Sequence, residues 1–390
     1  MTIKLVDDTI TQKDLDALSD WLRSGPRLTK GDLTVQFENA WSKWVGCKHA
    51  VFVNSGSSAN LAIIYALTLT EKLKNKKIVY PCLSWVTTVA PAIQFGLEPI
   101  LCDTDRSTLG LDLMHLEVLF KEHKPAALML VHALGFPNQM KEILSLCEKY
   151  GVLLLEDTCE TVGSTYGGTK TGNFGFASSF STYFGHHFST IEGGFVCTND
   201  TEFCNLLKSI RSHGWSRDLD SVTQKKLQSD YNVDDFRNLY TFYYPGFNLR
   251  STDLQAFIGL RQLEKLDEIC EKRNNNYKIY HSLIENNFWK IDDSAFEYVS
   301  NFAYPIIHPN KDHIVAALEA NDIECRPLIA GNIGKQPFYT SRYGSQNYPF
   351  ADVIHDYGLY VPNHQNLSVK QIETISHIVN KSMETAYDSE

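Results

Sequence analysis

Short apolar runs separated by amphipathic stretches recur along the first half of this chain and point to a layered α/β fold. The candidate strands are short apolar runs at residues 50–53, 78–80, 99–102, 127–131 and 152–156. Residues 59–70, 113–120 and 140–150 have helical patterns, and Gly151 is well placed to end the last helix. The alternation therefore predicts a mostly parallel sheet covered by helices.

The second half of the chain predicts a smaller unit. A helical pattern over residues 252–274 leads to strand-like residues 302–307 and 323–328, and a final helix follows from about Lys370. A chain of 390 residues can bury two cores. We expect a large domain over residues 1–260 and a smaller C-terminal α+β domain over residues 261–390.

Composition and charge exclude several classes of protein. Hydrophobic residues make up 43% of the chain and charged residues 21%, as in soluble globular proteins, and the net charge of −10 argues against binding to nucleic acid or anionic membranes. No signal peptide or membrane span is recognisable, and the nine cysteines include no CxxC pair. We therefore expect a cytoplasmic protein with reduced thiols and neither a membrane nor a nucleic-acid partner.

Two candidate ligand-binding segments directly follow predicted strands, where open α/β sheets place their sites. Ser55-Gly56-Ser57 follows the first strand and opens a helix. Its amides and hydroxyls suit a phosphate, although they can equally be an ordinary helix cap. Trp85 follows the second strand, where it either stacks on a planar ring or packs in the core.

Acidic side chains and a histidine pair make two further candidates. Glu156, Asp157 and Glu160 follow the apolar strand at 152–156, where a carboxylate either pairs with a pyridinium nitrogen or is simply solvated. His186 and His187 are adjacent, and no HExxH motif or spaced Cys/His set accompanies them, so we predict no metal site. No lysine or arginine occurs from 171 to 207.

In this order, the segments resemble the DegT/DnrJ/EryC1/StrS family of fold-type-I pyridoxal-phosphate aminotransferases. Besides the four segments, the resemblance rests on Ser181, on Glu192-Gly193-Gly194, on Gly246-Phe247-Asn248-Leu249-Arg250, and on Arg211-Ser212-His213-Gly214-Trp215-Ser216-Arg217. Glu324-Cys325-Arg326-Pro327 and Asn363-His364-Gln365 extend it towards the C-terminus. His186 occupies the position of the family's Schiff-base lysine, which is the mark of the branch that removes the sugar C3 hydroxyl.

The resemblance implies roles for the matching residues. In the cofactor site, Trp85 would stack on the pyridine ring, Asp157 would pair with its nitrogen, and Glu160 would lie near its hydroxyl. The cofactor phosphate would be held by Gly56, Ser57, Ser181 and, from a partner subunit, Asn248. His213, Arg217 and Arg326 would lie in the substrate region. Because Asn248 would act across an interface, the resemblance implies a homodimer with its active sites at that interface.

The implied activity is that of a 3-dehydratase in 3,6-dideoxysugar synthesis of the colitose type. The expected cofactor is pyridoxal phosphate, converted by L-glutamate to pyridoxamine phosphate. The expected substrate is a nucleotide-linked 4-keto-6-deoxyhexose, with GDP-4-keto-6-deoxy-D-mannose favoured, and the expected by-products are ammonia and 2-oxoglutarate. His186 would be the acid/base, because imidazole titrates near neutrality, although a shift of one residue would give that role to His187.

Three alternatives and one absence complete the expectations. The chain is alternatively a nucleotide-sugar aminotransferase with an atypical base, or a cofactor-binding protein without activity. The nucleotide is alternatively CDP, because no base-reading residue is recognisable. A related CDP-hexulose dehydrase adds an iron–sulfur cluster and a reductase, but no cysteine lies between Cys204 and Cys270 here. We therefore predict neither cluster nor reductase.

Overall fold

A computed structural model describes residues 2–384 and contains a seven-stranded central sheet. The strand order is β1-β9-β8-β5-β4-β2-β3. Neighbouring strands from β8 to β3 are parallel, and β9 runs antiparallel to both β8 and β1. The strands are β1 (His49–Val53), β2 (Lys77–Pro81), β3 (Glu98–Cys102), β4 (Ala127–Val131), β5 (Leu153–Asp157), β8 (Ala177–Ser181) and β9 (Gly194–Thr198). The predicted α/β fold with a mostly parallel sheet is confirmed.

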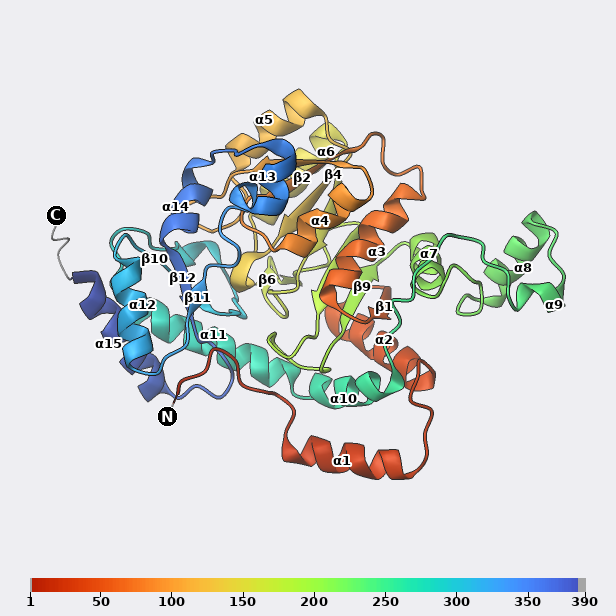
Figure 1. Cartoon of the computed structure of the whole chain (residues 1–390), viewed down its shortest axis with the longest axis horizontal. Helices are drawn as coiled ribbons and strands as arrows, with labels where there is room; N and C mark the ends of the chain where they lie inside the picture. Colours follow the sequence, from red (N-terminus) through yellow and green to blue (C-terminus); the bar gives the residue numbers. More distant parts are fainter. Residues whose placement is uncertain (1, 385–390) are drawn as a thin grey trace.

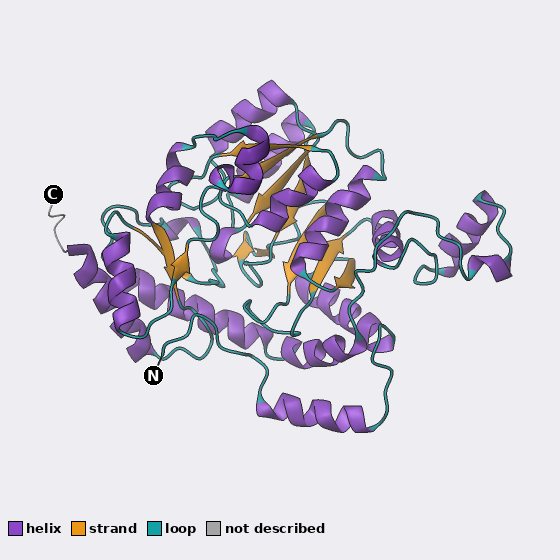
Figure 2. Cartoon of the chain, viewed as in Figure 1, coloured by secondary structure: helices purple, strands orange, loops and turns teal. Residues whose placement is uncertain are grey.

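Helices cover both faces of this sheet (Figure 2). One face packs on α3 (Gly56–Thr68), α4 (Val86–Gln94) and α7 (Thr201–Arg211). The other face packs on α5 (Leu113–His123) and α6 (Met140–Tyr150) at one end, and on α2 (Asp32–Val45) and α10 (Asp253–Leu263) at the other. Strand alternation produces the two faces: Val51 packs in the first core, whereas Phe52 packs in the core beneath α2.

The predicted strands and helices lie close to the observed ones. Residues 127–131 and 140–150 match β4 and α6 without any shift, and Gly151 ends α6 with φ 63° in the left-handed region. The long helical pattern at 252–274 divides into α10 and α11 (Leu266–Leu283). Strands β8 and β9 were missed, because β8 reads Ala-Ser-Ser-Phe-Ser and lacks an apolar run.

The C-terminal part contains a three-stranded antiparallel sheet in the order β10-β12-β11. Its strands are β10 (Tyr304–Ile307), β11 (Arg326–Pro327) and β12 (Gly358–Val361), so the predicted strand at 323–328 is reduced to two residues. Its helices are α12 (Lys311–Ala320), α13 (Pro337–Tyr343), α14 (Pro349–Tyr357) and α15 (Val369–Glu384). Ile3 pairs with Ile323, so the N-terminal residues also join this part. The domain boundary between 260 and 261 stays a prediction.

A helical arm stands away from the rest of the molecule, at the right of Figure 1. It carries α8 (Ser221–Asp230) and α9 (Asp235–Asn238). Its large apolar side chains are exposed: Val222 by 77%, Phe236 by 84% and Tyr240 by 74%. The remaining elements are α1 (Gln12–Arg23), the hairpin β6 (Thr165–Tyr166) and β7 (Thr169–Lys170), and the short 3-10 turns η1 (Ala133–Gly135), η2 (Asp293–Ala295) and η3 (Ile333–Lys335).

Candidate active site

The start of α3 meets the end of β8 at the carboxyl edge of the sheet. Ser55 caps the helix by accepting a hydrogen bond from the Ser58 amide at 3.0 Å, so the capping interpretation is correct. The amides of Gly56 and Ser57 have no acceptor among the described residues. A Cβ at Gly56 would lie 2.7 Å from Ser181 Cβ, so only glycine allows this approach. The result is a small cradle of free amides beside a serine hydroxyl, which is chemistry suited to phosphate.

Asp157 ends β5 as a buried carboxylate with three donors. Its Oδ2 accepts hydrogen bonds from Asn60 Nδ2 and Thr88 Oγ1, both at 2.8 Å, and its Oδ1 accepts one from the Cys159 amide at 3.1 Å. Only 5% of the residue is exposed, so the interpretation of a solvated strand end is wrong. Donors to both oxygens hold this carboxylate in place at the sheet edge, where it is suited to pair with a protonated ring nitrogen.

Glu160 lies three residues further on and connects this edge to the C-terminal sheet. Burial, with a smaller contribution from the charge of Asp157, raises the pKa of Glu160 to about 7, although its Oε2 accepts a hydrogen bond from the Leu134 amide at 2.9 Å. The pKa of Tyr360 is raised to about 12, mainly by burial of its phenol and to a smaller extent by the charge of Glu160. Tyr360 pairs with Arg326 across β12 and β11, so Arg326 belongs to the same neighbourhood.

His186 lies in the loop between β8 and β9, close to Asp157. Burial lowers the pKa of His186 to about 4, the positive charge of Arg273 adds to this effect, and the Asp157 carboxylate opposes it. The imidazole is therefore neutral at pH 7, and its Nδ1 has no partner among the described residues. Its ring packs against Phe302 with 5.2 Å between centroids. A neutral, half-buried imidazole of this kind can accept a proton.

His187 differs from its neighbour in burial and in partner. It is fully buried, and its Nε2 lies 2.9 Å from the backbone oxygen of Ser300, to which it donates a hydrogen bond. Burial lowers the pKa of His187 well below its ordinary value. With one ring nitrogen occupied by the backbone, His187 serves to anchor the loop that carries His186.

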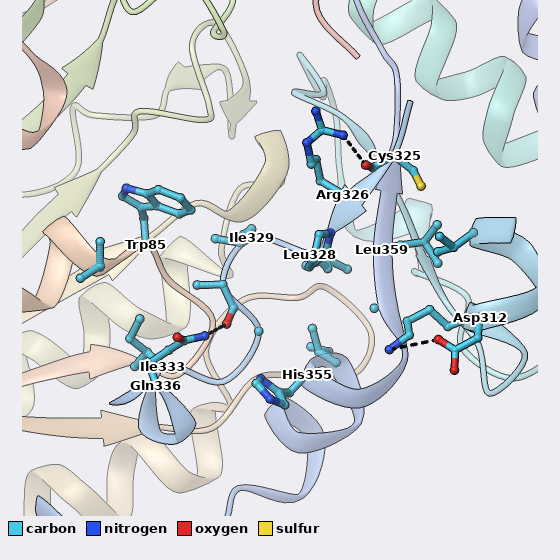
Figure 3. A pocket seen from close by; sticks show the side chains of 18 of the residues that line it. Trp85, Asp312, Cys325, Arg326, Leu328, Ile329, Ile333, Gln336, His355 and Leu359 are labelled. Carbon is cyan, nitrogen blue, oxygen red and sulfur yellow. Dashed lines mark hydrogen bonds and ion pairs between the residues drawn. The ribbon is translucent and has the colours of Figure 1, made fainter. Parts of the chain in front are cut away.

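Trp85 stands at the start of α4, beside a large cavity. The side chain is 53% exposed, so the core-packing interpretation is wrong. The cavity has a volume of about 760 Å³, and Figure 3 shows Trp85 and Arg326 in its wall, with His355 and Asp312 on other sides. Thr88 on the same helix bonds Asp157, and Thr87 bonds the Ser57 hydroxyl at 3.0 Å. Trp85 is thus held next to the cradle and the carboxylate.

His213, Arg217 and Asn248 form a second group at the base of the arm. Arg217 lies over the rings of Trp215 and Tyr240, at 4.3 and 4.7 Å from their centroids. His213 Nε2 lies 3.3 Å from Arg250 Nη2, and Asn248 is exposed. None of the three predicted residues lies in the wall of the cavity beside Trp85. Of the predicted site residues, only Trp85 and Arg326 lie in that wall, and the segment of Asn248 runs beside the start of α3, where the Asn54 amide donates to Leu249 O at 3.0 Å.

Several residues of the site were missed from the sequence. Thr88 is one helical turn after Trp85, and that spacing was an available signal. Tyr360 and Phe302 reach the site from the C-terminal part, and no local pattern marks them. Glu156, quoted only as a neighbour of Asp157, is fully buried: it lies 3.1 Å from His132 Nε2 and accepts bonds from the amides of residues 172, 174 and 175. That carboxylate fixes the turn that precedes β8.

Neither a metal-binding cluster nor a membrane-spanning helix occurs among the described residues. Residues 2–384 contain no group of three or more His, Cys, Asp or Glu side chains arranged to hold a metal ion. No helix in the same range is both long and apolar enough to cross a membrane.

A mostly parallel sheet with a phosphate cradle, a buried carboxylate and an exposed aromatic side chain along one edge is the arrangement of a pyridoxal-phosphate enzyme of the aminotransferase fold. Residues 8–380 match the model of the DegT/DnrJ/EryC1/StrS aminotransferase family. The chain belongs to this family, and the resemblance inferred from its motifs is confirmed.

Three relatives show the range of activities around the chain. It is 34% identical to the GDP-4-keto-6-deoxy-D-mannose 3-dehydratase of Yersinia pseudotuberculosis, over 97% of this chain and 98% of the relative. The Escherichia coli GDP-4-keto-6-deoxy-D-mannose-3-dehydratase, solved with bound hydrated pyridoxal phosphate, superposes with a TM-score of 0.88 at 30% identity, covering 97% and 99% of the two chains. The GDP-perosamine synthase of Caulobacter vibrioides is 26% identical, over 88% of each chain.

The residues at the sheet edge fit pyridoxal phosphate. The free amides of Gly56 and Ser57 and the Ser181 hydroxyl suit its phosphate, and the Asp157 carboxylate suits its ring nitrogen. The exposed Trp85 ring supplies a stacking surface, and the unpartnered Nδ1 of His186 leaves an acid/base group beside them. No lysine lies between 170 and 208 to hold the aldehyde covalently.

Proposed function

We propose that this protein is a pyridoxal-phosphate-dependent 3-dehydratase that removes the C3 hydroxyl of a nucleotide-linked 4-keto-6-deoxyhexose. The observation that carries the proposal is His186: a neutral imidazole beside Asp157, in a segment without lysine. The names of the relatives at 30–34% identity support GDP-4-keto-6-deoxy-D-mannose as the substrate. L-glutamate is the proposed amino donor, with ammonia and 2-oxoglutarate released.

The cofactor site is assigned to Gly56, Ser57, Ser181, Asp157 and Trp85. When bound as pyridoxamine phosphate, the cofactor supplies an amine for the C4 ketone and a ring that accepts electrons. Asp157 would pair with the ring nitrogen, because its carboxylate is held at the sheet edge by Asn60, Thr88 and the Cys159 amide. Trp85 fixes the plane of the ring by stacking.

His186 is the proposed acid/base of the reaction. Its imidazole is neutral at pH 7, so it can accept a proton from the carbon next to the cofactor ring. The imidazolium so formed is a strong acid, because its surroundings disfavour the charge, and it can protonate the departing C3 hydroxyl. Glu160, whose pKa is raised to about 7, lies at the same edge and would face the ring hydroxyl.

We further propose that the site is completed by a second copy of the chain. His213, Arg217 and Asn248 lie at the base of the arm, away from the cavity wall that holds Trp85 and Arg326. The arm also exposes Phe236, Tyr240 and other apolar side chains that a partner would cover. In a homodimer with two-fold symmetry, each arm would reach the other subunit's cavity, and Asn248 and Arg217 would act there.

Mixed dimers test this arrangement. His186→Asn and Arg217→Ala should each be inactive alone. If Arg217 acts across the interface, a hybrid of the two variants contains one intact site, and co-expression in equal amounts should restore about a quarter of wild-type activity. If Arg217 acts within its own chain, every hybrid site stays defective and no activity returns, which would refute the proposed arrangement.

Product analysis tests the activity itself. The protein, pyridoxal phosphate and L-glutamate are incubated with GDP- or CDP-linked 4-keto-6-deoxyhexose, and the expected products are a 4-keto-3,6-dideoxy sugar and ammonia. An amino sugar would support the aminotransferase alternative, which the GDP-perosamine synthase relative represents. If glutamate never changes the absorbance of the bound cofactor, the chain is a protein without activity. Full turnover without a reductase would agree with the predicted lack of an iron–sulfur cluster.

A further inference from the structure

Arg273 of α11 is a buried cation without a carboxylate partner. The residue is 2% exposed, and no ion pair joins it to any Asp or Glu in the described part of the chain. Its guanidinium instead reaches four backbone carbonyls: Nη1 lies 2.8 Å from Phe302 O, 2.5 Å from Asn363 O and 3.4 Å from Asn301 O, and Nη2 lies 3.3 Å from His186 O. One side chain thus connects three distant segments.

The other fully buried arginine shows how unusual this is. Arg211 is 1% exposed, but it lies within ion-pair distance of Glu38 and Asp218, at 2.5 and 3.3 Å. Those carboxylates cancel most of its field. Neutral carbonyls stabilise the charge of Arg273 but do not cancel it, and in a poorly polarisable interior that charge acts over several ångströms. Because a buried, unpaired charge is costly, its retention calls for a physical reason.

The field of Arg273 acts on a cluster of histidines. Burial is the main cause of the lowered pKa of His186, His187 and His364, and the Arg273 charge is the next largest effect that lowers it in each case. For His186, the Asp157 carboxylate acts in the opposite direction. The pKa of both His186 and His364 falls to about 4. Other titratable groups close to the His186 ring or on the adjoining segments are Asp157, Cys159, Glu160, Tyr183 and His187.

We propose that Arg273 is the positioning residue for His186: it holds the backbone carbonyl of the residue that carries the base and places an uncompensated positive charge beside the imidazole. This inference rests on the proposed role of His186. The contact with His186 O fixes the loop at the residue that carries the imidazole, and the contacts with Phe302 and Asn363 tie that loop to the C-terminal sheet. Asp157 favours the imidazolium form, and the charge of Arg273 acts against it in the same direction as the larger effect of burial.

The test measures the titration of His186 in the cofactor-free protein, by NMR of histidine-labelled samples with His186→Asn for assignment. Arg273→Gln removes the charge and Arg273→Lys keeps it. The proposal expects the titration midpoint of His186 to rise by about one pH unit in Arg273→Gln and to stay near wild type in Arg273→Lys. Arg211→Gln is the matched control: it removes an equally buried guanidinium that makes no contact with the His186 loop, so the midpoint should not move.

A purely structural Arg273 predicts a different pattern. Both variants would then lower stability, and neither would move the midpoint selectively, which would overturn the proposal. If Arg273→Gln does not fold, the wild-type protein still provides a test, because a His186 that titrates at an ordinary value near 6.5 would equally refute it. The readout needs no turnover, so an inactive enzyme with the expected titrations would count against the proposed function and not against this inference.

Discussion

Replacing Asp157 with asparagine tests the central electrostatic element of the site. All three contacts of this carboxylate come from donors: Asn60 Nδ2 and Thr88 Oγ1 at 2.8 Å on one oxygen, and the Cys159 amide at 3.1 Å on the other. Asparagine offers only one oxygen. If that oxygen faces Asn60 and Thr88, the new NH2 group meets the Cys159 N–H, and one buried donor loses its acceptor.

The expected size of the effect follows from that count. One unsatisfied buried donor costs about 1–3 kcal/mol of folding free energy, and unfolding of the cofactor-free variant should shift by that amount. The variant also loses the charged hydrogen bond to the ring nitrogen, worth about 1.5–3 kcal/mol. That loss corresponds to a dissociation constant for pyridoxal phosphate about 10 to 150 times larger than in the wild type.

Titration of cofactor-free protein with pyridoxal phosphate, followed by absorbance, measures the binding change, and chemical denaturation measures the stability change. Thr88→Val is the matched control, because it removes one donor to Asp157 and keeps the charge. It should be destabilised without a comparable loss of cofactor affinity. If Asp157→Asn binds the cofactor as tightly as the wild type, the assignment of Asp157 to the ring nitrogen is wrong.

Three further predictions follow from the same geometry. His186→Asn should abolish dehydration. His187→Asn should mainly destabilise the protein, by about 1–3 kcal/mol, because it disturbs the buried hydrogen bond to Ser300 O. Dehydration retained in His186→Asn would reverse the two roles. Gly56→Ala should weaken cofactor binding and cost about 1–3 kcal/mol, since its Cβ would lie 2.7 Å from Ser181 Cβ, and an unchanged affinity would count against the cradle. Because the pKa of Glu160 is raised, the folded protein holds the proton of this carboxyl up to about pH 7, whereas an unfolded glutamate releases it near 4.5. The contribution of Glu160 to the free energy of unfolding is therefore lost as pH rises from about 4.5 to 7. Glu160→Gln should therefore remove a fall in stability between about pH 4.5 and 7, and parallel stability–pH curves for variant and wild type would refute this.

The sequence predicted the parts of the fold that are encoded locally. A buried parallel strand needs a short apolar run, and each such run proved to be a strand. Strand β8 escaped because its serines are buried with their hydroxyls satisfied: Ser178 Oγ donates to Gly172 O at 2.7 Å. Each buried hydroxyl needs a hydrogen-bond partner elsewhere in the chain, and the periodicity of the strand sequence does not indicate that partner.

The candidate site was predictable where its residues directly follow strands or begin helices. Gly56, Trp85 and Asp157 stand at such places, and the topology brings them to one edge. Arg273 and Tyr360 were beyond reach because their contacts join segments separated by many residues, and the 87 positions between Arg273 and His186 carry no spacing signal. The roles of His213, Arg217 and Asn248 stay predictions, because none of the three lies in the cavity wall of a single chain.

The two adjacent histidines differ in their surroundings in the structure, although the sequence does not decide which of them is the base. By sequence, either imidazole could be the base. Burial and neighbours distinguish them, since His187 is fully buried with its Nε2 on Ser300 O, while the His186 ring is only half-buried and lies beside Phe302 and the Asp157 carboxylate. The half-buried ring is the one placed to exchange a proton. A lysine in place of that ring would bring a flexible amine that prefers to be charged, and Arg273 would disfavour that charge just as it disfavours imidazolium.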